Sequence, residues 1–389
     1  MNCRSRVRWP DSMAAPRVSR LRFAEVSLFV PDLDTPSVVV DLDVVEKNIQ
    51  RMASRARETG VRLRPHAKTH KIPEIGRLQL AAGASGISLA KTGEAEVFAA
   101  AGFDDLFLAY PVVGADKARR LLALSDRVRL AVGADSVEGA SSLGAVFHAA
   151  GRRLDVLLKV DCGYHRVGVP PERAIEAARR IAEVPGISLS GVFTHAGHAY
   201  LATTRAEVDL IARQEGETLA DAAGAVRAAG LPVQEVSVGS TPTARAAMAV
   251  DGVTECRPGN YVYHDASQIS LGTCEIGDCA MTVLATVISV PATDRAVLDC
   301  GSKTLSSDAL RPRPGGHGWI VGRRSRIEKL SEEHGVVRVE EGESFRVGEK
   351  VRVLPNHACV VSNLHDRIVL ARGDRVEGEW AVAARGRVR

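Results

Sequence analysis

The stretch TPSVVVDLDVVEKNIQRMASRARETGVRLRPHAKTHK, residues 35–71, decides the fold class of the chain. Its β-branched residues 37–40 predict a strand, and the apolar residues Val45 and Ile49 lie at the spacing of an amphipathic helix that Gly60 ends. The run VRLRPHAKT then predicts a second strand. A strand, a helix and a strand in this order form the unit from which parallel α/β proteins are built.

The same rhythm continues along the chain. The apolar runs GISLA, DLFLAY, VRLAV, LDVLLKVD, LSGVFTH and VQEVSVG follow one another, with helical patterns between them. Seven or more such units of about 25 residues predict a parallel (β/α)8 barrel of the TIM type, which we place at residues 40–265. An open, doubly wound sheet is the alternative.

The pattern changes after Tyr263. Runs such as MTVLATVISV and GVVRVE read as strands with hairpin-type turns and almost no helical periodicity. They predict a second, mostly antiparallel β domain built from residues 266–389 together with the N-terminal segment 23–39. Residues 1–22 are predicted to be a disordered tail.

The composition is that of a soluble globular protein, with 45% hydrophobic and 25% charged residues and a formal net charge of +4. Six arginines before residue 23 accompany a single acid, Asp11, so the remaining chain is near neutral. We expect neither nucleic-acid nor membrane binding, because these would need a basic stripe or an apolar run of about 18 residues. Seven cysteines without regular spacing suit a reducing compartment, and we expect the protein in the cytoplasm.

Polar clusters follow four of the predicted barrel strands: RPHAKTHK, KVDCGYHRVGV, FTHAGHAY and VSVGSTPTA. The carboxyl ends of barrel strands meet at one rim, so these clusters are expected to share a site. Lys68 is the candidate nucleophile, because a sheltered amine has a lowered pKa and can form a Schiff base with a carbonyl. The loop GSTPT, with its N–H groups and hydroxyls, favours pyridoxal phosphate as that carbonyl compound. A solvated basic surface is the alternative for RPHAKTHK.

Six motifs together resemble the family of D-threonine aldolases and D-serine dehydratases, pyridoxal-phosphate lyases of the alanine-racemase fold type. The motifs are DTPSVVVDLDVVEKNI, RPHAKTHK, DCGYHRVGV, HAGHAY, RPGNYVYHD and PNHACVVSNLHD. They run in order through nearly the whole chain from Asp34, and PHAKTHK together with PNHAC is the most specific pair. The resemblance implies a barrel followed by a β domain, a homodimer with sites at the subunit interface, and a divalent metal beside the cofactor.

The resemblance also implies roles for individual residues. Lys68 would hold pyridoxal phosphate, Arg166 would lie near its pyridine nitrogen, and His195 would lie by its ring. His195 and His198 are candidate bases, and a salt bridge within the barrel is the alternative for Arg166. The other implied cofactor contacts are His66, Gly239, Ser240, Thr241, Gly259, Asn260 and Tyr261.

His357 and Cys359 in PNHAC are the candidate metal ligands. Residues i and i+2 of a strand face the same side, so an imidazole and a thiolate could converge there on one ion. This donor pair favours zinc, with manganese or magnesium as alternatives. A buried cysteine beside a partly exposed histidine is the other interpretation.

We therefore expect a lyase that uses pyridoxal phosphate and a divalent metal and acts on small D-3-hydroxy amino acids. The preferred reaction is of the D-threonine aldolase type, giving glycine and acetaldehyde. The alternative is a D-serine dehydratase, which gives pyruvate and ammonia, and the His-x-Cys pair is familiar from the dehydratases. An amino-acid racemase would need a second base, usually a tyrosine from the β domain, and a pyridoxal-phosphate carrier without catalysis would leave the metal pair without a role.

Overall fold

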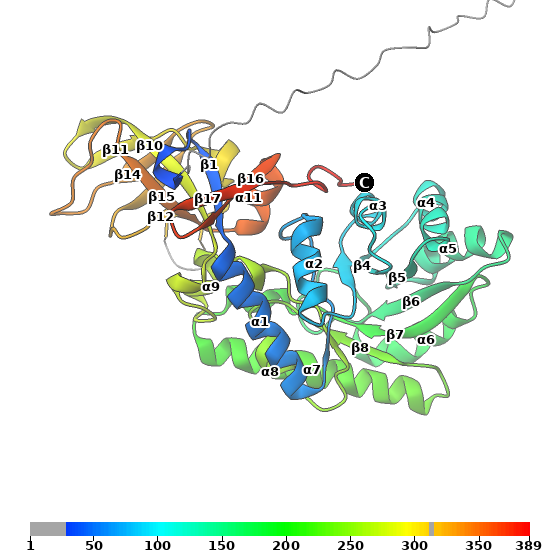
Figure 1. Cartoon of the computed structure of the whole chain (residues 1–389). Helices are drawn as coiled ribbons and strands as arrows, with labels where there is room; N and C mark the ends of the chain where they lie inside the picture. The colour runs from blue at the N-terminus through cyan, green and yellow to red at the C-terminus, as the bar shows by residue number, and fades with distance from the viewer. Residues whose placement is uncertain (1–28, 311–314) are drawn as a thin grey trace, which may run out of the picture.

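The computed structural model describes residues 29–310 and 315–389. Figure 1 shows an α/β barrel and a β domain, with helix α1 (Leu42–Thr59) running from the β domain along the side of the barrel. The predicted tail at residues 1–22 lies outside the described residues, as do residues 23–28.

Eight parallel strands form the barrel in the order β2-β9-β8-β7-β6-β5-β4-β3. An isolated bridge between His66 and Ser88 joins the two edge strands. The predicted parallel (β/α)8 barrel is confirmed. Its strands are β2 (Arg62–Leu63), β3 (Ile87–Leu89), β4 (Asp105–Pro111), β5 (Arg129–Ala134), β6 (Leu154–Lys159), β7 (Ile187–Phe193), β8 (Glu235–Val238) and β9 (Glu255–Cys256).

Helices alternate with these strands, and their ends follow local sequence signals. Helix α1 begins at Asp41, whose carboxylate accepts N–H groups of Asp43 and Val44, and it ends at Gly60, which has a φ of 67°. The other barrel helices are α2 (Pro73–Ala81), α3 (Thr92–Ala100), α4 (Ala115–Ser125), α5 (Val137–Ala149), α6 (Ala174–Ala182), α7 (Arg205–Ala228) and α8 (Ala244–Ala247), with short 3₁₀ turns η2 (Pro171–Arg173), η3 (Gly197–Leu201) and η4 (Asn260–Val262).

Two details of the barrel differ from the sequence-based expectation. The first predicted strand, β1 (Ser37–Asp41), belongs to the second sheet, where it pairs with β10 and β16. The last barrel strand, β9 (Glu255–Cys256), was not predicted, because a strand of 2 residues is too short to show a periodic pattern.

The β domain is one sheet of nine strands in the order β11-β14-β13-β12-β15-β10-β1-β16-β17, and an additional β10–β11 pairing closes part of it into a barrel. All strand pairs in this sheet are antiparallel except β1 with β16, so the predicted architecture is confirmed. Its later strands are β10 (Met281–Ala292), β11 (Arg295–Leu298), β12 (Gly318–Ile320), β13 (Arg326–Leu330), β14 (Gly335–Arg338), β15 (Lys350–Pro355), β16 (Arg367–Arg372) and β17 (Arg375–Ala381). Short helical segments accompany them: η1 (Val30–Asp32), α9 (Ala266–Ser270), η5 (Ile276–Asp278), α10 (Ser302–Leu305) and α11 (Ala358–Leu364).

Helix α1 joins the two cores of the molecule. Its residues Val45 and Ile49 are buried in the core beneath the β domain, whereas Ala56 is buried in the barrel core. The C-terminal end adds a second connection, because the N–H of Gly93 in α3 donates to the carbonyl of Arg389 at 2.7 Å. Figure 1 shows this end of the chain beside α3. The β domain is therefore held against the carboxyl rim of the barrel.

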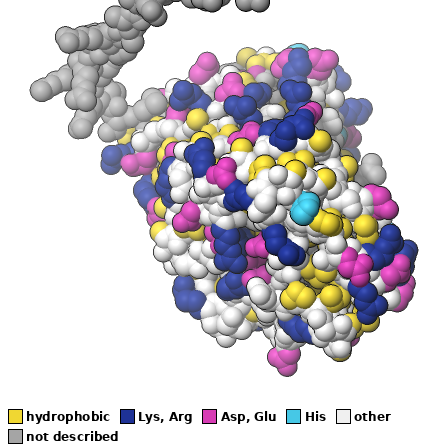
Figure 2. Space-filling view, turned by 90° about the vertical axis from the view of Figure 1, so that its right-hand side faces the viewer, with side chains coloured by type: hydrophobic (Ala, Val, Ile, Leu, Met, Phe, Trp, Pro, Cys, Tyr) yellow, Lys and Arg dark blue, Asp and Glu magenta, His cyan; other side chains and the backbone are white. Residues whose placement is uncertain are grey.

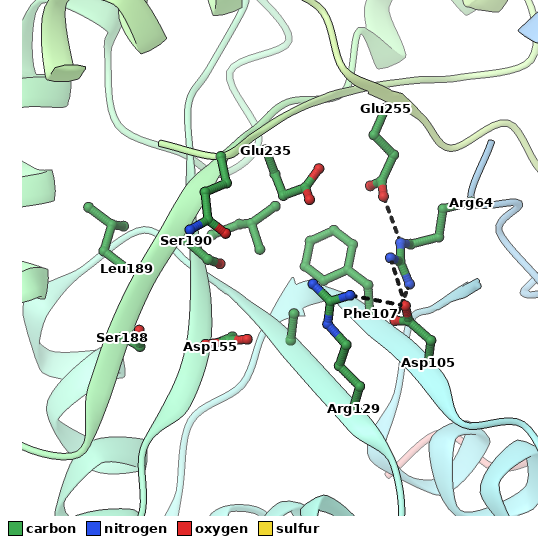
Figure 3. A pocket seen from close by; sticks show the side chains of 13 residues that line it. Arg64, Asp105, Phe107, Arg129, Asp155, Ser188, Leu189, Ser190, Glu235 and Glu255 are labelled. Atoms are coloured by element: carbon green, nitrogen blue, oxygen red, sulfur yellow. Dashed lines mark hydrogen bonds and ion pairs between the residues drawn. The ribbon is translucent and has the colours of Figure 1, made fainter. Parts of the chain in front are cut away.

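The amino-terminal end of the barrel carries a small polar pocket of about 130 Å³ (Figure 3). Buried Arg64 donates to Glu255 at 2.7 Å and to Asp105 at 2.5 Å, and Arg129 lies 3.7 Å from Asp105. Functional sites of such barrels gather at the opposite end. We therefore assign this charge network to the stability of the barrel.

Figure 2 shows basic and acidic side chains interspersed on one face of the molecule. Across residues 29–310 and 315–389, no helix combines the length and the apolar character that crossing a bilayer would require.

Candidate active site

A cavity of about 590 Å³ opens at the carboxyl ends of the barrel strands, beneath the β domain. Ten of the predicted site residues line it: His66, Lys68, His195, Gly239, Ser240, Thr241, Gly259, Asn260, His357 and Cys359. Further residues that were not predicted also line it: Thr69, Tyr164, Gly197, Tyr200, Leu201, Arg257, Ser267, Ser307, Asp308, Ala309 and Asn356. Both the barrel and the β domain therefore contribute to the cavity wall.

Lys68 projects from the turn that follows β2. Burial lowers the pKa of its amine; the thiolate of Cys359 opposes this shift, whereas the guanidinium groups of Arg166 and Arg257 add to it. A larger share of the amine is therefore neutral than in a solvent-exposed lysine. A neutral amine is the form that attacks a carbonyl and accepts a proton.

Two histidines in the cavity are held in opposite tautomers by their backbone contacts. His66 Nδ1 accepts the N–H of Lys68 at 3.3 Å, so its proton lies on Nε2. His195 Nδ1 lies 2.7 Å from the carbonyl of Gly239 and must donate to it, which leaves Nε2 as an acceptor. Burial, with the positive charge of Lys68, lowers the pKa of both imidazoles well below the usual value. His195 can therefore act as a base, and His66 as a donor.

The second predicted base does not reach the cavity. His198 lies in η3, and its ring centroid is 6.4 Å from that of Tyr164, which itself lines the cavity wall. His198 is not among the lining residues, and its Nδ1 is buried without a hydrogen-bond partner within the described chain. Its predicted role as a base therefore has no support from this geometry.

The loop after β8 and the turn before η4 pack so closely against neighbouring backbone that two positions need glycine. A Cβ at Gly239 would lie 2.7 Å from the backbone nitrogen of Arg257, and one at Gly259 would lie 2.8 Å from the carbonyl oxygen of His66. Gly239 also has a φ of 145°, which L residues rarely adopt. Gly239 therefore allows the loop after β8 to pack against the backbone of Arg257, and Gly259 allows the turn before η4 to pack against the segment that carries Lys68.

The hydroxyls of this loop are positioned by neighbouring groups. Thr241 Oγ1 accepts the N–H of Tyr261 at 3.0 Å, and Ser240 Oγ lies 2.8 Å from Thr243 Oγ1. The ring of Tyr261 instead points into the core, where its hydroxyl accepts from Gln79 Nε2 at 3.0 Å. Tyr261 thus acts on the loop through its backbone and is not a side-chain contact of the cavity.

Two arginines, Arg166 and Arg257, are candidates for a positively charged side chain in the cavity wall. Arg166 is exposed on the loop after β6, with its guanidinium 4.9 Å from the ring centroid of Tyr164, and it does not line the cavity. Arg257 is buried, lines the cavity, and donates to the carbonyl of Thr194 and to Ser237 Oγ at 2.5 and 2.7 Å. The sequence motif RPGNYVYHD contains Arg257, but nothing in it shows that this side chain points inward.

A chain of buried hydrogen bonds fixes the position of Arg257. Ser237 Oγ accepts from Arg257 Nε and donates to Glu255 Oε1 at 2.6 Å. Glu255 in turn accepts from Arg64 in the polar network of Figure 3. The cation that lines the cavity is therefore connected to the charge network at the other end of the barrel.

The two predicted metal ligands, His357 and Cys359, do not lie in a strand as predicted. Strand β15 ends at Pro355, His357 is the N-cap residue of α11, and Cys359 lies in the first turn of that helix. The proposed alternation of a strand is therefore wrong for these residues. The backbone turns at Asn356, whose Nδ2 donates to the carbonyls of Asp308 and Gly316 at 2.9 Å each.

The two side chains nevertheless meet at the cavity wall. Although burial opposes the shift, the charge of Cys359 and a 2.6 Å hydrogen bond to Asp308 raise the pKa of His357 to about 11. His357 in turn lowers the pKa of the Cys359 thiol against the effect of burial. Thr69 Oγ1 lies 3.2 Å from Cys359 Sγ. Among residues 29–310 and 315–389, no group of three or more His, Cys, Asp or Glu side chains is arranged to hold a metal ion.

The residues present fit pyridoxal phosphate. The cavity offers a buried amine at Lys68, a buried cation at Arg257, and the hydroxyl-bearing residues Ser240 and Thr241 in its wall. His357 and Cys359 would supply an imidazole and a thiolate, donors that fit a borderline-soft divalent ion.

A parallel barrel with a lysine at its carboxyl rim and an antiparallel β domain closing over it is the architecture of the alanine-racemase fold type. Residues 40–267 match the family model described as the alanine racemase N-terminal domain, and residues 280–371 match that of a putative serine dehydratase domain. The chain belongs to this family, whose members include pyridoxal-phosphate-dependent D-amino acid lyases.

Three similar proteins illustrate the family. The chain is 38% identical over 346 residues to a D-threo-3-hydroxyaspartate dehydratase of Delftia sp. (strain HT23), covering 84% of this chain and 91% of that protein. It is 35% identical over 361 residues to a D-threonine aldolase of Arthrobacter sp, covering 91% and 93% of the two chains. The crystal structure of a D-threonine aldolase from Filomicrobium marinum superposes with a TM-score of 0.86 at 32% identity, over 94% of this chain and 100% of that one.

Proposed function

We propose that the chain is a lyase of D-3-hydroxy amino acids of the D-threonine aldolase type, which cleaves D-threonine to glycine and acetaldehyde. The observation that carries the proposal is that Lys68, His195 and the His357–Cys359 pair line one cavity. An amine, a base and a metal-ligand pair are the groups that cleavage next to a hydroxylated carbon requires.

In this proposal, specific residues bind each part of the cofactor. Lys68 would hold pyridoxal phosphate, and Gly239, Ser240 and Thr241 would hold its phosphate. When bound, pyridoxal phosphate supplies an electron sink for negative charge at Cα of the amino acid. His66, Gly259 and Asn260 line the same wall and are proposed as further contacts.

The protein groups would move the protons. His195 Nε2, unprotonated and free to accept, would take the proton of the substrate 3-hydroxyl as Cα–Cβ breaks. Lys68, with its lowered pKa, would deliver a proton to Cα of the glycine product. Arg257, fixed by Ser237, would hold positive charge in the wall throughout.

His357 and Cys359 would hold a divalent ion, for which we favour zinc over manganese or magnesium. Such an ion supplies a Lewis acid that lowers the pKa of a hydroxyl. The Asp308 carboxylate, 2.6 Å from His357 Nδ1, would orient the imidazole so that Nε2 is the ligating atom.

A racemase is the weaker candidate on a specific ground. The expected second base is a tyrosine of the β domain, but residues 266–389 contain no tyrosine. A second copy of the chain could not supply one from its β domain either. The tyrosines near the cavity, Tyr164 and Tyr200, both belong to the barrel.

Dehydration of D-serine to pyruvate and ammonia is the second candidate. The match of residues 280–371 to a serine dehydratase model and the His-x-Cys pair favour it. In that reaction Lys68 would remove the Cα proton, and His195 would not be needed as a base.

The proposal also includes the organisation of the protein. We propose a barrel at residues 40–265, a β domain at residues 23–39 and 266–389, a homodimer and a cytoplasmic location.

A product assay tests the function. The purified protein is given D-threonine or D-serine, and glycine, acetaldehyde, 2-oxo acid and ammonia are measured with and without a chelator. We expect glycine and acetaldehyde from D-threonine, and no turnover after chelation. A 2-oxo acid with ammonia as the main product would select the dehydratase, and accumulation of the L-enantiomer would select the racemase.

A further inference from the structure

Two cysteines face each other outside the active site, in the loop between α9 (Ala266–Ser270) and β10 (Met281–Ala292). The thiol of Cys279 donates a hydrogen bond to the sulfur of Cys274, and the ring of His264 hydrogen-bonds to the same sulfur. Neither cysteine lines the cavity that contains Lys68. The proposed lyase reaction therefore leaves this pair of thiols without a role.

The backbone of the loop keeps the two sulfurs together. The turn η5 (Ile276–Asp278) folds the chain back, and the N–H of Cys279 donates to the carbonyl of Ile276 at 3.1 Å. Cys279 Sγ also lies 3.8 Å from the carbonyl of Glu275. The contact between the thiols is therefore built into the loop and needs no rearrangement of distant elements.

Ion pairs with α1 anchor the loop to the rest of the molecule. Asp278 lies 3.1 Å from Arg51 and 3.4 Å from Lys47, and its carbonyl accepts from Asn48 Nδ2 at 2.8 Å. These contacts do not involve either sulfur. A change in the oxidation state of the thiols would thus leave the anchors of the loop in place.

Solvent molecules can reach the pair. Both cysteines are partly exposed, and Thr273, the neighbour of Cys274 in the chain, lines an open groove of about 910 Å³ that neither cysteine lines. The partial exposure of the two thiols is what gives small oxidants access to them. Buried Cys256 and Cys300 have no such access.

Cys274 also has the electrostatic character of a reactive thiol. The hydrogen bond from Cys279 and the nearby His264 lower the pKa of Cys274 to about 6, against the effect of burial. The same contact raises the pKa of Cys279. By contrast, burial raises the pKa of Cys162 to about 11. The contact between the two sulfurs therefore favours thiolate character at Cys274 and the protonated thiol at Cys279.

We propose that Cys274 and Cys279 form a reversible redox-modification site, a dithiol that a peroxide converts to an intramolecular disulfide. The Cys274 thiolate attacks the O–O bond of hydrogen peroxide, which gives a sulfenic acid and, after proton uptake, one water. Cys279 then attacks the Cys274 sulfur and displaces the sulfenic oxygen as a second water. The two thiols lose two electrons, hydrogen peroxide gains them, and a dithiol reductant reverses the change by thiol–disulfide exchange.

The test measures the disulfide directly in the full-length holoenzyme. The protein is treated with one equivalent of hydrogen peroxide, alkylated, and cleaved with trypsin and a protease that cuts after glutamate. Cleavage after Glu275 separates Cys274 from Cys279, so a disulfide keeps the two peptides joined until a reductant is added. We expect the joined peptides, together with an intact mass lower by two hydrogen atoms than that of the reduced protein.

Variants that lack one cysteine each show which thiols the disulfide requires. Cys274→Ser and Cys279→Ser should each abolish the joined peptides, and Cys279→Ser should instead accumulate oxygen on Cys274. Cys162→Ser, which removes another partly exposed cysteine, should form the disulfide as the wild type does. The proposal is overturned if both thiols of the wild-type protein remain alkylatable after peroxide, or if Cys274 is cross-linked to another cysteine. The intact-mass measurement on the wild type stands even if a variant fails to fold.

Discussion

At the scale of single residues, hydrogen bonds decide which groups of the cavity can act. His66 and His195 share the cavity, yet their backbone partners protonate them on opposite nitrogens. Lys68 gains its reactivity from burial, although its neighbours include the thiolate of Cys359, which opposes the shift. Such assignments depend on contacts of 2.7 to 3.3 Å that no sequence motif contains.

Replacing Lys68 tests the anchor of the cofactor. Borohydride should fix the yellow chromophore onto Lys68, and Lys68→Ala should lose it or hold it only noncovalently. We expect kcat of that variant to fall by about 10²–10⁴-fold, because the proton-transfer group at Cα is also lost. Peptide mapping of the reduced protein locates the label. Lys91→Ala is the matched control, and recovery of the label on Lys71, Lys91 or Lys159 would contradict the assignment.

Replacing Arg166 tests whether an exposed cation influences the chemistry. Arg166→Glu should slow or redirect the reaction, because Arg166 contributes to the lowered pKa of Lys68 and His195. The free energy of unfolding should stay within about 0.5 kcal/mol of the wild type, since the residue is exposed. The measurements are kcat, product ratio and Tm, with Arg173→Glu on η2 as the control. Unchanged kinetics would show that Arg166 has no part in the chemistry and would leave Arg257 as the functional cation.

At the scale of elements, short irregular segments at the strand ends carry the site. The metal pair lies at the start of α11, and Lys68 and His70 lie in the turn between β2 and α2. His70 Nδ1 accepts the N–H of Ile72, the N-cap residue of α2, at 3.1 Å. The same short segment thus positions the reactive lysine and starts the next helix.

The metal pair gives a prediction about turnover and stereochemistry. Chelation should abolish turnover of D-3-hydroxy amino acids while leaving the spectrum of bound cofactor largely intact, because the ion acts on the substrate side chain. L-Threonine and L-serine should be poor substrates, since inversion at Cα turns the side chain away from His357 and Cys359. Cys359→Asp should shift the preference from zinc towards manganese or magnesium, because a carboxylate is a harder ligand.

Activity and metal content are measured together after chelation and after adding back each ion. Cys162→Ser serves as the control for loss of a thiol. Full activity in the chelated protein, or equal rates on the two enantiomers, would refute the metal role.

His70 predicts a loss of stability in acid. Burial lowers the pKa of His70 from 6.5 to about 4. Between these values the unfolded chain binds a proton that the folded protein does not, so the free energy of unfolding falls as pH falls through this range. The contribution is up to about 3 kcal/mol, and His66 and His195 act in the same direction.

Denaturant unfolding at pH 7 and pH 5 measures this loss. His70→Asn should reduce the difference between the two pH values, because the amide oxygen can still accept from Ile72 but does not titrate. His148→Asn, at an exposed position of α5, should keep the wild-type difference. An unchanged pH dependence in His70→Asn would contradict the assignment.

At the scale of the whole molecule, hydrogen bonds connect the two ends of the barrel. The network of Figure 3 continues from Arg64 through Glu255 and Ser237 to Arg257 in the cavity wall. The β domain closes the other end and brings the metal pair to Lys68. The site therefore depends on barrel closure and on the packing of the β domain at the same time.

Breaking the network should affect both stability and the cavity. Arg64→Met leaves the buried carboxylate of Glu255 without its cation, whereas partly buried Asp105 keeps Arg129, and we expect a loss of about 3–5 kcal/mol in the free energy of unfolding. Affinity for pyridoxal phosphate should also fall, since Glu255 helps to hold Arg257. Arg62→Met, which removes an exposed ion pair with Glu235, should cost at most about 1 kcal/mol. Equal effects of the two substitutions, measured by denaturant unfolding and cofactor titration, would refute the special role of Arg64.

The architecture of both domains follows from local patterns of residues. Helix and strand periodicity is a local property, so the alternation from residue 35 onward predicted the barrel, and the later hairpin pattern predicted the antiparallel domain. Because parallel strands present their carboxyl ends on one side, the sequence also brought together Lys68, His195 and the loop at Gly239.

Only the tertiary structure decided which side chains meet. It placed Arg257 in the cavity and left Arg166 exposed, and it moved His198 out of reach. It also put His357 and Cys359 at the start of a helix rather than in a strand, and it paired Cys274 with Cys279. The physical reason is that the direction of a side chain depends on barrel closure, on turns too short for a periodic signal and on contacts between residues far apart in the chain, none of which local sequence patterns encode.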